Sequence, residues 1–283
     1  MSRPEHLAPP ELFYGEDEAA KYTQNSRIAT IQAEMALRAL ELLCLPEDKT
    51  CFLLDIGCGS GLSGEILDEE GHIWVGCDVA PAMLDIAKER EVEGDLFLQD
   101  IGEGFGFRPG TFDGAISVSV LQWLCNADKS NHVPHKRLAR FFSTLYSALA
   151  HGSRAVFQFY PETDSQLEMI MTAATRCGFT GGLVVDYPNS KKAKKYYLCL
   201  FSGQVPGKKQ ELPKALEGDG ESTVAYSSKG KEHFAKHKGR GKGRKQVKDK
   251  NWVLHKKELA RQRGRTDVPT DSKYTARKRR PRF

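Results

Sequence analysis

Residues 53–61 read Leu-Leu-Asp-Ile-Gly-Cys-Gly-Ser-Gly, and the rest of the chain is organised around this stretch. The apolar residues 52–56 are typical of a buried strand, and a glycine then stands at every second position. Residues 62–67 indicate the start of a helix. A strand, a glycine turn and a helix together present backbone N–H groups and a helix N-terminus to a ligand. Glycine suits such a turn because a Cβ would collide with the ligand or forbid the backbone angles.

Three interpretations of this loop are possible. It could bind a dinucleotide, it could bind a different ligand, or it could bind no ligand. Gly59, Gly61 and Gly64 fit the Gly-x-Gly-x-x-Gly fingerprint of nicotinamide and flavin enzymes. Against that interpretation, Gly57 follows the strand directly and an acid, Asp55, lies inside the strand end. The remaining alternative is a glycine-rich turn that binds nothing. The following strands decide between these three.

Two further apolar strands each end in an acid. Residues 72–78 end in Asp78, and residues 95–100 end in Asp100. Asp78 lies about 20 positions after Gly57, where an acid accepts hydrogen bonds from a ribose diol. A nicotinamide enzyme does not require the third acid. Three consecutive strands with an acid at the same end are more specific than the glycines alone, and they disfavour the dinucleotide.

The core alternates strands and helices along its length. The predicted strands are residues 51–57, 72–78, 95–100, 112–118, 153–160, 182–187 and 195–202, and the predicted helices are 60–70, 81–91, 136–150 and 164–177. This pattern predicts an α/β fold with a doubly wound, Rossmann-like, mostly parallel sheet of seven strands. The loop before the last strand is short, so that strand must run antiparallel. Right-handed crossovers would then bring the acids to one edge.

Composition divides the chain into three parts. Residues 1–50 are predicted to form a helical lid, with helices at 17–25 and 27–43 after a loose, proline-rich start. Residues 51–203 form the cofactor-binding core, and residues 204–283 form a basic, largely flexible tail that begins as a linker. Residues 1–203 hold 18 Lys and Arg against 28 Asp and Glu, whereas residues 204–283 hold 24 against 9. Such asymmetry favours a polyanionic partner for the tail.

The tail has features that a solubilising extension does not need. Trp252, Tyr274 and Phe283 are interleaved with its charges and could stack on bases. Its end, residues 277–283, fits a nuclear localisation signal or an RNA contact. The alternative is a disordered tail that only keeps the protein soluble.

The cysteines and the apolar runs indicate in which cellular compartment the protein works. The seven cysteines are scattered without a Cys-x-x-Cys pair, and several lie in apolar strands. They are interpreted as buried thiols in a reducing compartment, and we expect no metal site. No run approaches the length of a membrane span, and the N-terminus lacks the apolar region of a signal peptide, so we expect no membrane partner.

With these acids and glycines, the core resembles the class I S-adenosylmethionine-dependent methyltransferases, whose first motif has the same order of residues. Four segments narrow the resemblance: residues 10–14, 122–127, 185–190 and 274–283. Together they resemble the eukaryotic small-subunit rRNA guanine-N7 methyltransferases, the Williams–Beuren-region methyltransferase family. This resemblance covers nearly the whole chain, tail included.

The resemblance implies an activity, a location and a partner. The activity is methyl transfer from S-adenosyl-L-methionine to N7 of a guanine in 18S rRNA during small-subunit biogenesis, with S-adenosyl-L-homocysteine as product. The location is the nucleus, in nucleoplasm or nucleolus, with the cytoplasm left open. The partners are the pre-ribosomal small-subunit rRNA and a small zinc-binding activator protein, which forms a heterodimer with the enzyme.

The resemblance also implies roles for single residues, matched by position. Asp55, Gly57, Gly59 and Gly61 hold the methionine end of the cofactor, Asp78 holds the ribose, and Asp100 with Ile101 holds the adenine. The other cofactor candidates are Cys58, Val79, Met83 and Ser117. Candidates for substrate contact are Gln122, Trp123 and Tyr160, and candidates for lid contact are Tyr14, Tyr22 and Arg27. For the aromatic residues, simple core packing stays open as an alternative.

No catalytic base is expected. Guanine N7 carries a free lone pair and loses no proton on methylation, so the enzyme mainly needs to place and desolvate the reactants.

The third strand is expected at an edge of the sheet, where its backbone can pair with another chain. Leu96, Phe97 and Leu98 put apolar side chains on both faces, with no Lys or Pro among them. Burial by the flanking helices would cover these side chains but not the open backbone. We therefore expect the activator protein to add a strand here.

Two other functions stay open at this stage. One is a class I methyltransferase that acts on a protein or a small molecule, with the tail serving only for localisation. The other is a ribosome-assembly factor whose binding role outweighs its catalysis.

Overall fold

The computed structural model describes residues 3–46, 49–190, 193–204 and 210–216, with a few single positions between 254 and 271. The chain divides into two units, residues 1–238 and 239–283, and the first contains the fold. Trp252, Tyr274 and the basic residues 277–283 lie outside the described residues. Among the described residues, no helix has both the length and the apolar character needed to cross a membrane.

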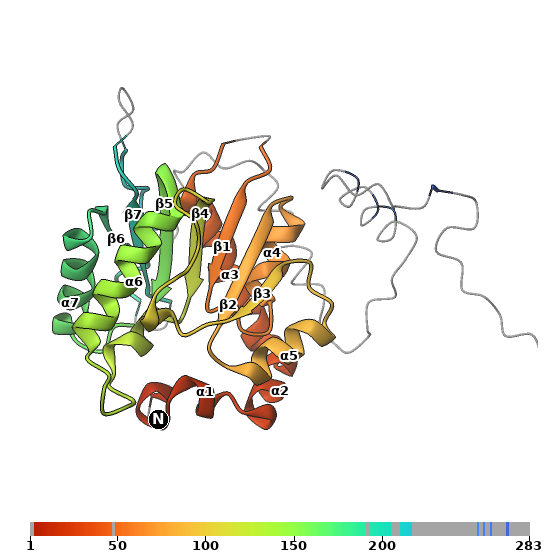
Figure 1. Ribbon diagram of the computed structural model, residues 1–283, viewed down its shortest axis with the longest axis horizontal. Helices are drawn as coiled ribbons and strands as arrows, with labels where there is room; N and C mark the ends of the chain where they lie inside the picture. The colour runs from red at the N-terminus through yellow and green to blue at the C-terminus, as the bar shows by residue number, and fades with distance from the viewer. Residues whose placement is uncertain are drawn as a thin grey trace, which may run out of the picture. The chain divides into compact units, whose positions relative to one another are not determined.

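A seven-stranded sheet with the order β3-β2-β1-β4-β5-β7-β6 forms the centre of this unit (Figure 1). Its strands are β1 (Phe52–Ile56), β2 (Ile73–Asp78), β3 (Asp95–Leu98), β4 (Phe112–Val118), β5 (Leu149–Phe159), β6 (Thr180–Asp186) and β7 (Lys195–Phe201). The strand β7 runs antiparallel to both β5 and β6, and the other pairs are parallel. The predicted doubly wound fold with a reversed last strand is confirmed, and β3 lies at an edge as expected.

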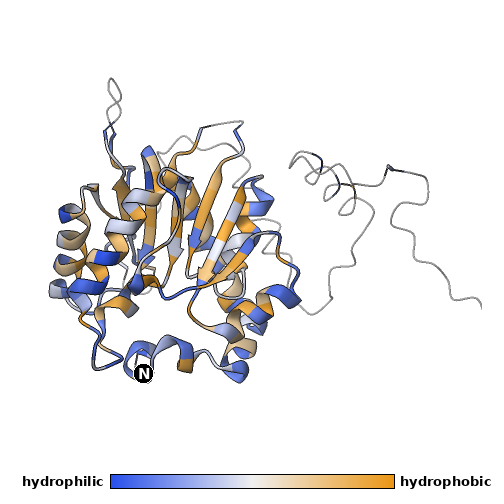
Figure 2. Ribbon diagram, viewed as in Figure 1, coloured by the Kyte–Doolittle hydropathy of each residue, from blue (hydrophilic) through white to orange (hydrophobic). Residues whose placement is uncertain are grey.

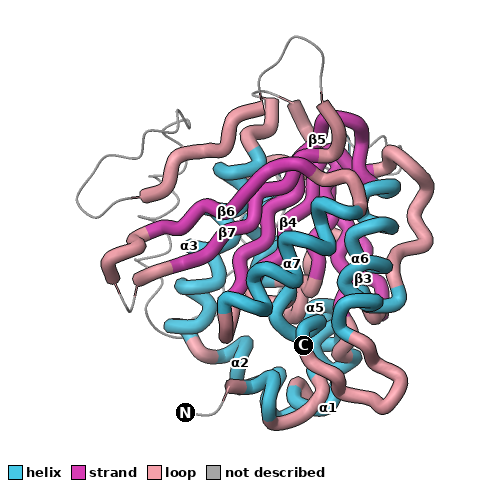
Figure 3. Tube along the Cα trace, turned by 90° about the vertical axis from the view of Figure 1, so that its left-hand side faces the viewer, coloured by secondary structure: helices cyan, strands magenta, loops and turns pink. Residues whose placement is uncertain are grey.

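Helices cover both faces of the sheet, with α3 on one side and α6 and α7 on the other (Figure 3). The helices are α1 (Pro10–Phe13), α2 (Glu16–Gln24), α3 (Ser26–Leu43), α4 (Leu62–Glu69), α5 (Pro81–Glu89), α6 (Pro134–Ala148) and α7 (Asp164–Arg176), with the 3-10 turns η1 (Pro4–His6), η2 (Ile101–Glu103) and η3 (Leu121–Cys125). Apolar residues dominate the strands, while the helices mix polar and apolar residues (Figure 2), and the buried apolar residues form two main clusters. The buried core therefore lies in two layers, one on each face of the sheet.

The proline-rich start of the chain is more ordered than the sequence predicts. Residues 10–13 form α1, and Pro10 occupies its first position. Proline is favoured there because its fixed φ matches the helix and its missing N–H would have no partner within the helix. A proline cluster therefore indicates a helix start here, where we expected a loose segment. Asn25 likewise fixes the start of α3 by accepting hydrogen bonds from the backbone N–H groups of Arg27 and Ile28.

Trp74 of β2 explains one glycine of the dinucleotide fingerprint. The indole is 2% exposed, and a Cβ on Gly64, Gly76 or Gly94 would overlap it. Gly64 is the last glycine of the Gly-x-Gly-x-x-Gly match, and it allows α4 to pack closely over β2. Its presence therefore requires no phosphate ligand.

Residues 210–216 pack back on the core, although the sequence predicts a linker from residue 204 onward. Arg38 of α3 is 6% exposed and donates from Nε and Nη2 to the carboxylate of Asp186, at 2.8 and 3.1 Å. The same Nη2 donates to the carbonyl of Lys214 at 2.9 Å, and the backbone N–H of Leu216 donates to Asp186 Oδ1 at 2.9 Å. We call residues 210–216 the strap. It adds one hydrogen bond to each member of this buried ion pair.

The strap runs along the edge strand β6 toward its carboxyl end. At its start, Gln210 donates to the carbonyl of Gly152 at 3.5 Å, near the beginning of β5. In its middle, Leu212 lies against Gly182, where a Cβ would collide with the leucine side chain. At its end, Leu216 accepts a hydrogen bond from the backbone N–H of Tyr187 at 2.7 Å. The chain is thus led from the amino edge of the sheet to its carboxyl edge.

The strap predicts a difference between two truncations. A chain that ends at residue 203 loses the two hydrogen bonds from the strap to Arg38 and Asp186, whereas a chain that ends at residue 216 keeps them. Hydrogen bonds to charged groups contribute about 1.5–3 kcal/mol each, so the shorter chain should lose about 2–4 kcal/mol of unfolding free energy. Urea denaturation of both truncations measures this. Equal midpoints and slopes would show that the strap does not stabilise the core.

Candidate active site

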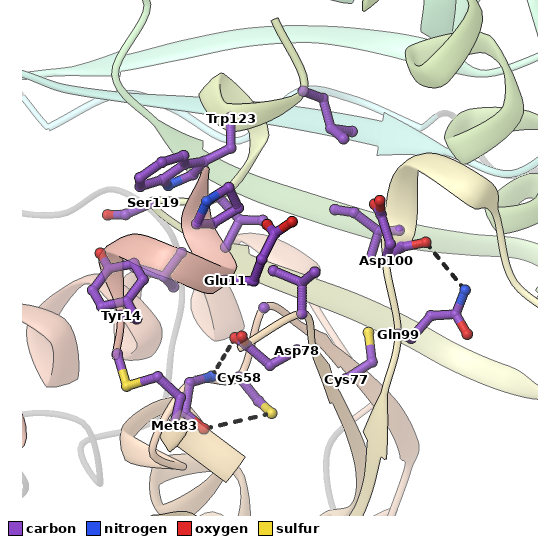
Figure 4. A pocket seen from close by; sticks show the side chains of 18 of the residues that line it. Glu11, Tyr14, Cys58, Cys77, Asp78, Met83, Gln99, Asp100, Ser119 and Trp123 are labelled. Carbon is purple, nitrogen blue, oxygen red and sulfur yellow. Dashed lines mark hydrogen bonds between the residues drawn. The ribbon is translucent and has the colours of Figure 1, made fainter. Parts of the chain in front are cut away.

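A pocket opens at the carboxyl edge of the sheet, where the loops after β1, β2, β3 and β4 meet. Eleven of the sequence-predicted residues line it: Gly57, Cys58, Gly59, Asp78, Val79, Met83, Asp100, Ile101, Trp123, Tyr14 and Tyr22. Tyr14 and Trp123 lie on one side and Gln99 with Asp100 on the other, with Asp78 and Glu11 between them (Figure 4). The three acid-tipped strands and the lid thus converge on one cavity.

The glycine loop, residues 57–61, owes its shape to positive φ angles. Gly57, Gly59 and Gly61 have φ of 72°, 52° and 80°, in the left-handed region that favours glycine. The backbone N–H groups of Gly57 and Cys58 both donate to the carbonyl of Cys77, at 2.8 and 3.1 Å. These bonds fix the loop against the end of β2.

Asp78 connects the glycine loop to the loop after β2. Its Oδ2 accepts from the N–H of Gly59 and its Oδ1 from the N–H of Ala80, each at 2.9 Å. Burial raises the pKa of Asp78, while the backbone hydrogen bonds oppose this rise. The carboxylate is therefore held in one orientation with accepting capacity left toward the pocket.

Two buried polar atoms beneath the glycine loop have no hydrogen-bond partner among the described residues: Asp55 Oδ1 and Ser60 Oγ. The other oxygen of Asp55 accepts from Ser63 Oγ at 2.6 Å. The pKa of Asp55 is raised to about 7: burial and the charge of Asp78 raise it, and the hydrogen bond from Ser63 opposes the rise. Buried polar groups are normally paired, so these two atoms fit a polar ligand group such as an ammonium or a carboxylate.

Asp100 is positioned by partners that sequence reasoning missed. Its Oδ1 accepts from the backbone N–H of Gly102 at 2.8 Å and from Arg137 Nη2 at 2.5 Å. Arg137 also lies 3.0 Å from His132 Nδ1, and both residues line the pocket. Arg137 belongs to the first turns of α6, which start at Pro134, and only the fold brings it to Asp100. Local sequence holds no signal for this contact.

An aromatic cluster covers the pocket. Tyr14 lies 6.0 Å from Trp123 and 5.7 Å from Tyr22, and Phe13 lies 6.1 Å from Trp123, between ring centroids. Burial raises the pKa of Tyr14 and of Tyr22 above the usual tyrosine value, so both hydroxyls stay neutral near pH 7. The lid thus contributes rings and neutral hydroxyls to the pocket.

A second contact ties the lid down. Glu11 of α1 forms an ion pair at 3.1 Å with Lys129, which lies in the loop before α6.

Six predicted site residues do not line the pocket: Asp55, Gly61, Ser117, Gln122, Tyr160 and Arg27. Asp55 is fully buried beneath the glycine loop, Gly61 precedes α4, and Ser117 donates to the carbonyl of Ile56. Gln122 donates to the carbonyl of Ser119, which does line the pocket. Arg27 is exposed in the first turn of α3, and Gln32 of the same helix faces the pocket instead.

Tyr160 is held away from the cavity by its own partners. Its hydroxyl donates to Met35 Sδ at 3.4 Å and accepts from Lys195 Nζ at 2.9 Å. Ser119 lines the pocket, and its φ of 62° is unusual for a residue other than glycine. Backbone strain of this kind is often found at functional sites.

Two family models match the chain. A model described as "Methyltransferase domain" matches residues 54–157, and one described as "Methyltransferase involved in Williams-Beuren syndrome" matches residues 200–281. Among solved structures, the Haemonchus contortus phosphoethanolamine N-methyltransferase 2 in complex with S-adenosyl-L-methionine has a TM-score of 0.52 and 18% identity, and the match covers 72% of this chain and 61% of that one. At that identity the likeness shows the fold alone.

Two of the similar curated proteins match over nearly their whole length. The 18S rRNA (guanine-N(7))-methyltransferase of Mus musculus is 57% identical over 283 residues, covering 99% of this chain and 98% of the mouse protein. The 18S rRNA (guanine(1575)-N(7))-methyltransferase of Saccharomyces cerevisiae is 52% identical over 284 residues, covering all of both chains. With the class I methyltransferase sheet and the pocket at its carboxyl edge, these identities show that the chain belongs to the family of 18S rRNA (guanine-N7)-methyltransferases.

Proposed function

We infer that this chain transfers the methyl group of S-adenosyl-L-methionine to N7 of a guanine in 18S rRNA. The relatives named for this activity match the basic tail as well as the methyltransferase domain. In the structure, the observation that carries the inference is one pocket that joins the acid-tipped strand ends to an aromatic cover. An RNA substrate also gives the basic tail a polyanion to bind, whereas a protein or small-molecule substrate would leave the tail with a localisation role only.

The residues at the carboxyl edge fit the parts of the cofactor. When bound, S-adenosyl-L-methionine supplies an electrophilic methyl group on a sulfonium. The fixed carboxylate of Asp78 would accept hydrogen bonds from the ribose diol, and Asp100 with Ile101 would meet the adenine. The unpaired oxygens of Asp55 and Ser60 would receive polar groups of the amino-acid end.

The chain's own contribution to the reaction is placement and exclusion of water. The neutral lone pair of guanine N7 needs no base, and Tyr14 could not serve as one because burial raises its pKa. Trp123 presents an indole beside Tyr14, a surface on which a base can stack. Alignment of two reactants of this kind can lower a barrier by about 7–11 kcal/mol.

We also propose that β3 is the docking strand for a small zinc-binding activator protein. Phe97 is 48% exposed and Leu98 is 61% exposed at this edge of the sheet, while Leu96 packs against the core. An edge strand with open backbone groups and exposed apolar side chains favours pairing with a strand of another protein. We propose a nuclear location as well, on the basis of the basic end of the tail.

Methylation is tested directly with labelled cofactor and small-subunit precursor particles. The label should map to N7 of a single guanine in 18S rRNA.

The cofactor site is tested with a variant. Asp78→Ala should lower the affinity for S-adenosyl-L-homocysteine by about 10- to 100-fold, since hydrogen bonds to charged groups contribute about 1.5–3 kcal/mol. Calorimetric titration measures the affinity, with Lys49→Gln at the opposite edge of the sheet as control. In the labelling experiment, label on another base or on protein would overturn the proposed methylation of guanine N7.

The raised pKa of Asp55 predicts a pH dependence of cofactor binding. Below pH 7 the buried carboxyl is mostly protonated, and it becomes an anion as the pH rises through 7. The α-amino group of the ligand keeps most of its charge up to about pH 7.5. If this ammonium meets ionised Asp55, the affinity for S-adenosyl-L-homocysteine should increase several-fold between pH 6 and 7.5, because the ionised fraction of Asp55 increases over that range.

The matched variant for this test is Asp55→Asn, which cannot ionise. Its affinity should be lower and nearly independent of pH over the same range. Calorimetry in buffers of different ionisation enthalpy should also show proton release on binding by the parent chain and none by the variant. A parallel pH dependence in both proteins would remove Asp55 from the cofactor site.

The edge-strand proposal predicts loss of a complex. Phe97→Lys should abolish co-purification with the activator protein, whereas Met171→Lys on α7, also at an exposed apolar residue, should not. Both variants should keep the parent's affinity for S-adenosyl-L-homocysteine, which shows that the glycine loop and the fold are intact. Hydrogen exchange of residues 95–98 that is unchanged by the partner would place the docking surface elsewhere.

A further inference from the structure

The carboxyl edge of the sheet has two halves of different character. Following the strand order, β3, β2, β1 and β4 lead into the residues of the pocket, whereas no residue of β5, β7 or β6 lines it. The register pairs Phe159 of β5 with Tyr196 of β7, and Lys195 with Asp186 of β6. Tyr160, Lys195 and the end of β6 therefore lie side by side, next to the pocket but outside it.

Three cationic side chains lie at the half of the edge formed by β5, β7 and β6. Lys195 Nζ lies 2.9 Å from the hydroxyl of Tyr160 and 5.0 Å from its ring centroid, and Lys194 Nζ lies 4.9 Å from the ring centroid of Tyr196. Arg3 donates to the carbonyls of Tyr160 and Pro161, at 3.0 and 3.2 Å. We call Arg3, Lys194 and Lys195, with the ring of Tyr160, the basic shoulder.

The shoulder cations have no carboxylate partner within the described ranges. Two acids lie nearby. Asp186 is buried and is occupied by Arg38 and the strap, and Glu162 lies 3.0 Å from His6 Nε2. The opposite half of the edge carries acids instead, since α2 begins with Glu16, Asp17 and Glu18 and packs on α5. A polyanion that approaches this edge is attracted to one half and repelled from the other.

Hydrogen bonds connect the shoulder to the pocket wall. The backbone N–H of Tyr160 donates to Gln122 Oε1 at 3.5 Å, and Gln122 Nε2 donates to the carbonyl of Ser119 at 2.8 Å. Ser119 and Trp123 both line the pocket. The shoulder therefore adjoins the side of the pocket that lies away from the cofactor acids, where a target base would enter.

The strap brings the start of the basic tail to the same place. Its last described residue, Leu216, is hydrogen-bonded to Asp186 and to Tyr187 at the carboxyl end of β6. Residues 217–283, which follow, contain 21 Lys and Arg against 8 Asp and Glu. A segment tethered beside a bound polyanion acts at a high effective concentration, which falls as the tether lengthens.

We propose that the basic shoulder binds backbone phosphates of the rRNA strand that carries the target guanine, and that the strap fixes the root of the tail so that both contact the same RNA. The proposal rests on the proposed function, which supplies the RNA. Aromatic rings interleaved with cations fit single-stranded RNA, because bases can stack where phosphates are paired. An acidic protein surface would need the charges but not the rings.

The first test uses the full chain with both shoulder lysines neutralised, Lys194→Gln with Lys195→Gln. The probe is an 18S rRNA fragment that the parent chain methylates. Its dissociation constant at low salt should rise about three- to tenfold, and the slope of log affinity against log salt should become shallower by about 1–2. The rate at saturating RNA and the affinity for S-adenosyl-L-homocysteine should not change. Lys49→Gln, at the amino edge, is the matched control.

The second test lengthens the tether without changing any charge. Insertion of a Gly/Ser segment of about 20 residues after Leu216 should weaken RNA binding about two- to fivefold, because the effective concentration of the tail falls. The same insertion beyond the tail's last basic residue serves as control.

The outcomes separate the two proposals. A parent chain that methylates no 18S rRNA would overturn the proposed function. A parent chain that does, together with lysine variants of unchanged affinity and salt slope, would overturn the shoulder alone. If the lysine variants bind RNA normally but no longer bind an acidic protein, the RNA role of the shoulder is also overturned. The surface would then belong to that protein.

Discussion

The carboxylate of Asp78 accepts one backbone hydrogen bond from the loop after β1 and one from the loop after β2. Taking a carboxylate out of water is costly unless hydrogen bonds compensate it, and here two peptide groups do so. Those same bonds fix Gly59 in a left-handed conformation and align the start of α5. One charged group therefore sets the geometry of both loops and remains available to a ligand.

Much of this arrangement was predictable because it depends on local pattern and on strand direction. The apolar runs ending in Asp55, Asp78 and Asp100 predicted parallel strands, and parallel strands necessarily bring those acids to one edge. The glycine loop was predictable for a related reason, since its positive φ angles leave a visible mark in the sequence. The helix α1 was missed because the proline-rich start was interpreted as a loose segment, although Pro10 marks a helix start.

The contacts that escaped prediction are long-range and depend on charge. Arg38 and Asp186 are separated by 148 positions, and the strap that they hold has no periodicity of its own. The pairing of Arg137 with Asp100 likewise depends on where α6 crosses the sheet. Tyr160 was expected at the substrate, yet Met35 and Lys195 hold its hydroxyl outside the pocket. Sequence alone shows which residues are polar, and the fold decides which of them meet.

Trp74 lies in a space that three glycines leave open. The chain has three tryptophans, and each belongs to a different part of it. Trp123 borders the pocket and contacts the lid, while Trp252 belongs to the basic tail, outside the described residues. Indole emission responds to the polarity around the ring. Three versions of the chain, each retaining one indole, would therefore give separate optical signals for unfolding of the core, for entry of a ligand beneath the lid, and for contact of the tail with nucleic acid.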